Sequence, residues 1–265
     1  MKALNLAVAG LVIVLAGCGS QPAVAPTSTA SPGSSRVAPS PSPAPVHVLV
    51  FSRTTAFRHA SIPAAVAAVE KLGAEHGYLV DATEDPGAFT DANLARYRAV
   101  VFLLTTGDVL DAGQQAAFER YIRAGGGFAG VHSASDTEYG WAWYGQLVGA
   151  YFKHHPAVQP AVVRIEDPGH PSTASLPTRW MRTDEWYDFR TNPRGAVHVL
   201  ATVDESSYSG GGMGTDHPIV WCHGFDGGRS WYTAMGHAAE SYVDPSFLSH
   251  LEGGIESVAG IRGAC

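Results

Sequence analysis

Basic side chains are scarce in this chain of 265 residues. Lys and Arg number 17 against 24 Asp and Glu, which gives a formal net charge of −7, and no run of Lys or Arg occurs. A protein that binds nucleic acid through charge needs such a run or patch. The composition therefore does not indicate that the protein binds nucleic acid. The 45% hydrophobic content instead predicts a packed globular core.

Cysteine is also rare, with three residues in the chain. Neither a Cys-x-x-Cys nor a His-Glu-x-x-His pattern occurs, so no motif with diagnostic metal-ligand spacing is present. We therefore expect no cofactor and assign no metal ligand. A metal held by scattered histidines and carboxylates stays as a weaker alternative.

The amino terminus has the pattern of an exported lipoprotein. Met1-Lys2 is followed by the apolar run Ala3–Ala16, which is too short to span a bilayer as a mature helix. The sequence Leu15-Ala16-Gly17-Cys18 resembles the bacterial lipoprotein box. This resemblance implies cleavage before Cys18, its lipidation and a membrane-anchored domain outside the cytoplasm, on the periplasmic or cell-surface face. An ordinary secretory signal with an incidental cysteine is the alternative.

Three regions are expected along the chain: a signal peptide at 1–17, a tether at 18–45 rich in Ser, Pro and Ala, and a single domain at 46–262. The tether composition cannot build a core. Within the domain, Cys222 lies in an apolar run and is expected to be a small buried residue. A disulfide from Cys222 to Cys265 is the alternative that an exported protein permits.

Strands and helices alternate in the first half of the domain. Apolar runs predict strands at 46–51, 78–83 and 99–104. Helical spacing predicts helices at 62–76, 91–97 and 111–124. This alternation predicts an α/β fold with a doubly wound, mainly parallel sheet and right-handed crossovers.

The pattern changes in the second half. After a helix predicted at 141–150, strands are predicted at 158–166, 180–189, 197–203, 219–224 and 230–235. Phe225–Arg229 joins the last two with the glycines of a hairpin turn. We expect these strands to form an antiparallel or mixed extension of the sheet, followed by a closing helix at 244–259.

Residues 125–136 are expected to form the centre of the functional site. Three glycines and a short apolar run, which predicts a strand, come directly before His132, Ser133 and Asp136. These polar residues are therefore expected at the carboxyl end of that strand. Ligands of open α/β sheets bind at the carboxyl ends of strands, where the loops converge. The polar residues that we expect in one cleft there are Arg58, His59, Thr105, Thr106, His132 and Asp136, joined by His237 after the last strand. His154 follows the helix at 141–150.

Asp184–Asp188 places three carboxylates beside two aromatic residues. Alternation along a strand would send Asp184 and Trp186 to one face and Glu185 and Tyr187 to the other. A carboxylate beside an imidazole can act as an acid/base pair. The expected catalytic residues are therefore His132, Asp136, His59, Glu185 and His237, and the expected substrate-binding residues are Arg58, Thr105, His154, Asp184, Trp186 and Tyr187.

Two further patterns bear on the chemistry. A nucleophile elbow needs its nucleophile between glycines, but Gly130-Val131-His132-Ser133-Ala134 carries a histidine there. All six tryptophans follow residue 140. Exposed tryptophan and tyrosine rings beside carboxylates suit a sugar, although we expect at least half of the tryptophans to pack in the core.

Taken together, several motifs resemble the ThuA-like (trehalose utilisation) family. They are Phe57-Arg58-His59, Gly125–His132, Trp143-Tyr144 with Leu147-Val148-Gly149, Thr183–Tyr187, Asp216-His217-Pro218 and Gly236-His237. The resemblance covers Val46 to Ala259. It implies the flavodoxin-like fold of class I glutamine amidotransferases and a link to carbohydrate metabolism, in some members to oxidised keto-sugars.

The resemblance also sharpens the expected function. The amidotransferase cysteine is absent, since His132 stands at the elbow, and glutaminase activity is not expected. We predict a protein that binds a carbohydrate, such as a keto-sugar or disaccharide, and transforms it by histidine/carboxylate chemistry as an isomerase, lyase or hydrolase. A non-catalytic carbohydrate-binding or interaction module and a metal-dependent hydrolase are the alternatives. The oligomeric state is left open.

Overall fold

The computed structural model describes residues 9–19, 23, 45–263 and 265. The chain divides into two compact units, 1–42 and 43–265. Much of the expected signal peptide and nearly all of the expected tether lie outside the described residues. Residues 9–19 have no regular secondary structure, and Cys18 is exposed with a free thiol. No helix in the described ranges is long and apolar enough to cross a membrane.

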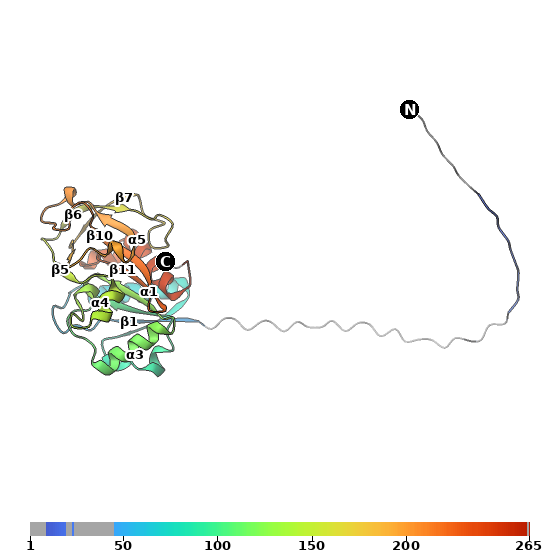
Figure 1. The fold of residues 1–265 in the computed structure, drawn as a ribbon, viewed down its shortest axis with the longest axis horizontal. Coiled ribbons are helices and arrows are strands. Elements are labelled where there is room, and N and C mark those ends of the chain that lie inside the picture. Colours follow the sequence, from blue (N-terminus) through green and yellow to red (C-terminus); the bar gives the residue numbers. More distant parts are fainter. Residues whose placement is uncertain (1–8, 20–22, 24–44, 264) are drawn as a thin grey trace, which may run out of the picture. The chain divides into compact units, whose positions relative to one another are not determined.

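The second unit begins with four strands, paired in parallel, and the helices between them. In order these are β1 (Val46–Phe51), α1 (Ile62–His76), β2 (Tyr78–Thr83), α2 (Asp91–Leu94), β3 (Ala99–Leu103), α3 (Ala112–Arg123) and β4 (Gly127–Val131); β1, α1 and α3 are labelled in Figure 1. The caps explain two of these boundaries. Gly77 adopts φ 82° and ends α1, and Asp111 with Gln114 forms a capping box that begins α3. The predicted helix at 91–97 is shorter than expected.

The remaining elements supply the antiparallel half. They are α4 (Ala142–Val148), β5 (Phe152–His154), β6 (Gln159–Ile165), β7 (Arg179–Asp184), β8 (Asp188–Phe189), β9 (His198–Val203), β10 (Pro218–Phe225), β11 (Gly228–Thr233) and α5 (Pro245–Ala259). Five 3₁₀ segments connect elements: η1 (Pro86–Ala88), η2 (His132–Asp136), η3 (Pro193–Gly195), η4 (Glu205–Ser207) and η5 (Ala239–Val243).

Nine strands form one sheet in the order β2-β1-β3-β4-β11-β10-β9-β6-β7. The first five are parallel, and every pairing from β11 to β7 is antiparallel. The predicted α/β fold with an antiparallel extension is therefore confirmed. One detail was not expected: β11, the last strand in the chain, lies in the middle of the sheet, parallel to β4.

The strand directions decide which loops share an edge. Four antiparallel pairings separate β11 from β7, so the direction is reversed four times and β7 again runs parallel to β4 and β11. The carboxyl ends of β1, β4, β11 and β7 consequently lie along the same edge. The residues that follow these four strands are the ones that can meet there.

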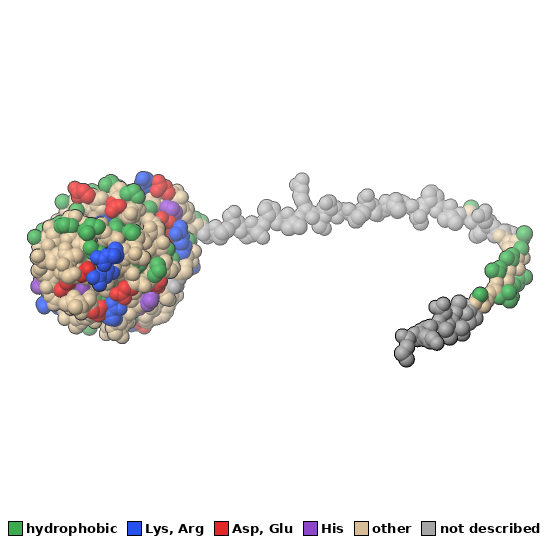
Figure 2. All heavy atoms as spheres, turned by 90° about the horizontal axis from the view of Figure 1, so that it is seen from above, with side chains coloured by type: hydrophobic (Ala, Val, Ile, Leu, Met, Phe, Trp, Pro, Cys, Tyr) green, Lys and Arg blue, Asp and Glu red, His purple; other side chains and the backbone are tan. Residues whose placement is uncertain are grey.

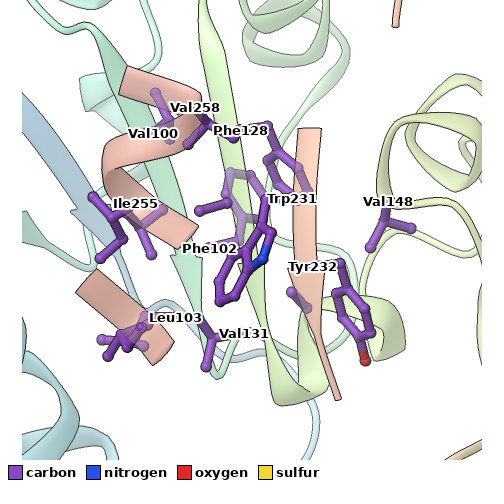
Figure 3. Packing of buried hydrophobic residues seen from close by; sticks show 14 of the residues in the cluster. Val100, Phe102, Leu103, Phe128, Val131, Val148, Trp231, Tyr232, Ile255 and Val258 are labelled. Carbon is purple, nitrogen blue, oxygen red and sulfur yellow. The ribbon is translucent and has the colours of Figure 1, made fainter. Parts of the chain in front are cut away.

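Helices cover both faces of the sheet, and large side chains fill the space beneath them. Figure 3 shows Trp231 on the side of β11 that faces α5, and Tyr232 on the other side, toward Val148 of α4. Gly254 makes the α5 contact close, because a Cβ there would lie 2.4 Å from the Trp231 ring. At the surface, acidic, basic and apolar side chains are mixed over the face of the second unit that Figure 2 presents.

The single strand predicted at 180–189 is wrong. The chain breaks after Asp184, so that β7 stays in the large sheet and β8 pairs with β5 in a separate two-stranded sheet. The Asp184 carboxylate accepts the backbone N–H of Glu185 at 3.0 Å, which competes with continuation of the strand. The expected alternation of faces therefore fails: both Asp184 and Glu185 are buried, as are Trp186 and Tyr187.

Cys222 is buried on β10, as expected, but its sulfur is bonded to that of Cys265. The Cα atoms are 5.8 Å apart and the bridge closes a separation of 43 residues. The alternative left open by the sequence is thus the one that the structure adopts. The bridge ties the end of the chain to the antiparallel half of the sheet.

Candidate functional site

His132 stands in a strained turn directly after β4. Its φ is 53°, in the left-handed region that non-glycine residues seldom occupy, and the chain then enters η2. Such a conformation costs about 1–3 kcal/mol and persists where the surrounding structure enforces it. The strand, sharp turn and short helix have the form of a nucleophile elbow, with an imidazole at the position of the nucleophile.

Two hydrogen bonds fix the orientation of the His132 ring, which is completely buried. Nδ1 lies 2.7 Å from the carbonyl oxygen of Ala234 and donates to it, which directs Nε2 toward Tyr187 and Glu185. The Tyr187 hydroxyl lies 3.0 Å from Nε2. Burial raises the pKa of Tyr187 well above its usual range, so this hydroxyl keeps its proton.

Glu185 brings a carboxylate to the same place from the end of β7. Its Oε2 lies 3.4 Å from Nε2 of His132 and 3.2 Å from Nδ1 of His237. Burial alone would raise the pKa of Glu185, but contacts with the two histidines outweigh this effect and hold the pKa below its usual value. Glu185 is therefore an anion in the middle of the group.

His59 completes the group from the loop after β1. Its ring centroid lies 4.9 Å from that of His132 and 5.3 Å from that of His237. Burial, followed by the proximity of His132 and His237, lowers the pKa of His59 to about 3. The ring is consequently neutral near pH 7, and its Nδ1 lies 3.4 Å from the Ser133 hydroxyl. Phe57, which is 64% exposed, packs edge-on against it at the surface.

His237 follows β11 and is placed by its backbone. The N–H groups of Gly236 and His237 donate to the Asp184 carboxylate at 3.0 and 3.1 Å. Gly236 adopts φ 113°, and a Cβ there would lie 2.8 Å from the Tyr242 hydroxyl, so only glycine fits. The His237 side chain is 27% exposed, and its contact with Glu185 raises its pKa. This histidine is where the group meets solvent.

The structure thus brings together four of the five residues predicted as catalytic. Ligand atoms of His59, His132, Glu185 and His237 all lie within 4.8 Å of one another, and we call these four residues the HHEH centre. Asp136 lies beside the centre at the end of η2, where it accepts a 2.6 Å hydrogen bond from Tyr139. Burial raises the pKa of Asp136.

The predicted substrate-binding residues are distributed differently. Tyr187 contacts the centre, and Asp184 supports it through the backbone of His237. Trp186 is completely buried, with its indole N–H bonded to the carbonyl oxygen of Gln159, so its ring faces no ligand space in this structure. Thr105 is buried against Thr137.

Two other predicted residues lie outside the centre. Arg58 is exposed and makes a bidentate pair with Glu84, at 2.7 and 3.0 Å. His154 is exposed at the end of β5, and its Nε2 lies 3.4 Å from Asp188. In its place, the next residue reaches the centre: Nδ1 of His155 lies 3.1 Å from Oε1 of Glu185. The prediction therefore chose the wrong histidine of the pair His154-His155.

Three groups of side chains among the described residues have the composition of a metal site. They differ in how many of their ligand atoms already make hydrogen bonds or ion pairs with other residues. In Asp188–Glu205–His217, both ring nitrogens of His217 have partners, Glu205 Oε1 and the Tyr187 carbonyl, each at 2.8 Å. In His76–Glu252–Glu256, Arg262 pairs with both carboxylates, at 3.1 and 2.7 Å. The HHEH centre contains no Lys or Arg.

The fold and this centre define a class: a flavodoxin-like α/β protein with a histidine/carboxylate group at the carboxyl edge of its sheet. Residues 47–257 match the family model ThuA, described as trehalose utilisation, and the chain belongs to this family. The resemblance inferred from the motifs is confirmed. The curated proteins compared with the chain contain no match.

Solved structures agree with the assignment. A ThuA-like protein from Bacteroides uniformis is 26% identical with a TM-score of 0.68, over 80% of this chain and 91% of that one. A ThuA-like protein from Parabacteroides merdae is 18% identical with a TM-score of 0.68, over 83% and 91%. A β-galactosidase from Rahnella sp. R3 is 15% identical with a TM-score of 0.53, over 78% of this chain and 31% of that one. The last two similarities concern the fold alone.

Proposed function

We propose that this protein binds a carbohydrate at the HHEH centre and transforms it, with imidazole and carboxylate groups as the reactive side chains. The observation that carries this proposal is the convergence of four buried or half-buried polar residues, from four strand ends, on one point. The family description, trehalose utilisation, supports a sugar as the substrate class.

The same convergence favours an enzyme over a passive sugar-binding module. A binding module that reads sugar faces needs exposed aromatic rings. In this protein four of the six tryptophans, Trp180, Trp186, Trp221 and Trp231, are buried, and Trp141 and Trp143 are partly buried against the core. Burying three imidazoles and a carboxylate costs free energy that a purely structural core would avoid with apolar residues. Buried titratable groups that lie close together in spite of this free-energy cost are typical of a reactive site.

The amino terminus supports a place of action. We infer from Leu15-Ala16-Gly17-Cys18 that the protein is exported and anchored through lipid on Cys18, and works on the extracytoplasmic face. The exposed free thiol of Cys18 and the disulfide between Cys222 and Cys265 agree with an exported protein. Membrane fractionation of the wild type and of Cys18→Ser tests this inference. Retention of the variant in the membrane fraction would contradict it.

The function is tested by screening the purified full chain against ordinary and oxidised disaccharides, with calorimetry for binding and chromatography for turnover. His132→Ala is the diagnostic variant, because the ring makes no contact at the outer surface. We expect wild type to bind and convert at least one sugar, and His132→Ala to lose conversion. If His132→Ala, folded by circular dichroism, leaves binding and turnover unchanged, the proposal is wrong.

A further inference from the structure

We propose that His59, His132, Glu185 and His237 bind one divalent transition-metal ion of the zinc type. The ion would be held by Nε2 of His132, Nδ1 of His237, Oε2 of Glu185 and a ring nitrogen of His59. This inference concerns the same residues as the proposed function but does not depend on the substrate being a sugar.

The donor set itself points to such an ion. Three imidazoles and one carboxylate are ligands that zinc and its neighbours accept, whereas calcium and magnesium require mainly oxygen. The imidazoles come from loops after β1, β4 and β11, and the carboxylate from the end of β7. Four ligands that follow four separate strands thus meet at one edge of the sheet.

The distances fit a tetrahedral ion better than direct hydrogen bonds. Zinc lies about 2.0–2.1 Å from nitrogen or oxygen ligands, which places tetrahedral ligands about 3.3–3.4 Å apart. Oε2 of Glu185 is 3.4 Å from Nε2 of His132 and 3.2 Å from Nδ1 of His237. Charge-assisted hydrogen bonds between such groups are about 2.7–2.9 Å long. Two of the distances among the four ligand atoms are thus those of a tetrahedral ion, and all of the atoms lie within 4.8 Å of one another.

Two of the ring nitrogens are prepared for a ligand role. Nδ1 of His132 is bonded to the Ala234 carbonyl, an outer contact of the kind that orients metal-binding histidines and directs Nε2 to the ion. Nδ1 of His237 is buried and makes no well-aligned hydrogen bond among the described residues, although Oε2 of Glu185 lies 3.2 Å away. A buried nitrogen without an aligned partner is costly unless something binds it.

The comparison with the other two groups strengthens the assignment. His217 has both ring nitrogens engaged by Glu205 and a backbone carbonyl, and Arg262 neutralises the carboxylates beside His76. The histidine of the first group and the carboxylates of the second thus already have partners, although both carboxylate oxygens of Asp188 make no hydrogen bond among the described residues. Groups in and beside the HHEH centre also compete for its ligand atoms: the Tyr187 hydroxyl lies 3.0 Å from Nε2 of His132, and the Ser133 hydroxyl lies 3.4 Å from Nδ1 of His59. An ion bound at Nε2 of His132 would displace the Tyr187 contact.

The test uses the full chain, treated with chelator, dialysed and titrated with Zn²⁺ by calorimetry and with Co²⁺ by absorption spectroscopy. We expect one ion per chain and the intense visible absorption of tetrahedral cobalt. Glu185→Gln and His237→Ala should each weaken binding by roughly 100-fold or more. His198→Ala is the matched control, because it removes an exposed histidine that pairs with Asp167.

Circular dichroism establishes that each variant is folded, and Glu185→Gln preserves the shape of the side chain if His237→Ala does not fold. Absence of stoichiometric Zn²⁺ binding would overturn the inference, as would equal affinity in the wild type and Glu185→Gln. All measurements are made without sugar, so failure here leaves the proposed function standing, and failure to convert sugars leaves the metal site standing.

Discussion

Nε2 of His132 lies 3.4 Å from Oε2 of Glu185, although the first follows β4 in the parallel half of the sheet and the second follows β7 at its antiparallel edge. The contact exists because β7 runs in the same direction as β4 and delivers its end to the same edge. This contact joins the parallel and antiparallel halves of the domain at the HHEH centre.

His154 and His155 give a matched pair of variants. Nδ1 of His155 lies 3.1 Å from Oε1 of Glu185, whereas His154 faces Asp188; the two side chains are 38% and 51% exposed. We expect His155→Ala to lower kcat/KM for the converted sugar by roughly fivefold, because a partly exposed ion pair is worth up to about 1 kcal/mol. His154→Ala should stay within about twofold of the wild type. The prediction fails if steady-state kinetics give the reverse order.

Asp184 holds the backbone on which the site depends. Its carboxylate accepts the backbone N–H of Glu185, Gly236 and His237 and also contacts buried Arg182 at 3.0 Å. Asp184→Asn removes the charge and turns an acceptor into a donor, so we expect a loss of about 2–3 kcal/mol in the free energy of unfolding. Urea denaturation measures it, with Asp108→Asn, at an exposed aspartate, as the control. Equal midpoints for the two variants would contradict this role.

The disulfide between Cys222 and Cys265 should contribute measurably to stability. For a closed loop of this length, 43 residues, the chain-entropy model gives about 4 kcal/mol, and measured values are commonly about 2–4 kcal/mol. Cys265→Ser is the cleaner variant, because Cys265 is exposed whereas Cys222 is buried. We expect its melting temperature to equal that of the reduced wild type. A variant as stable as the oxidised wild type would refute the prediction.

Acid should destabilise the domain through its buried histidines. His250 is completely buried between the Ser172 carbonyl and the Thr233 hydroxyl, and burial lowers its pKa to about 3. Because the folded pKa lies below the unfolded value of about 6.5, the unfolded chain binds the proton first as the pH falls. The stabilisation is complete above about pH 6.5 and is lost between there and pH 3, at up to about 1.4 kcal/mol per pH unit for one histidine.

Urea denaturation at pH 7, 6, 5 and 4 measures this dependence. His250→Gln should reduce its slope, because the glutamine amide does not titrate in this range. The exposed variant His198→Ala should keep the slope of the wild type. The account of His250 is wrong if the slope is unchanged in His250→Gln.

Much of the fold could be predicted because its determinants are local. The apolar runs of β1 and β3, the capping glycine at Gly77 and the hairpin before β11 each carry their own pattern. The same local patterns placed His59, His132 and His237 at strand ends. Parallel topology then implied that they share an edge, and the structure brings them together.

The rest depends on contacts between distant residues. Glu185 reaches His132 because four antiparallel pairings bring β7 back to the direction of β4. The number of such pairings cannot be read from the periodicity of the sequence. The chain turn at Asp184 depends on N–H groups from Gly236 and His237, about fifty residues away. The contact of His155 rather than His154 with Glu185 also joins residues distant in the sequence, as does the hydrogen bond of buried Trp186 to Gln159. The metal-like arrangement depends on ring orientation, which the Ala234 carbonyl sets.

The most direct test of the central claim is the turnover of the converted sugar by Glu185→Gln, measured beside the wild type under the same conditions. Glutamine keeps the size of the side chain and removes the charge that His132 and His237 face. The account predicts that kcat falls by about 10²- to 10⁴-fold while the unfolding midpoint changes little. A variant that folds normally and retains the kcat of the wild type would contradict it.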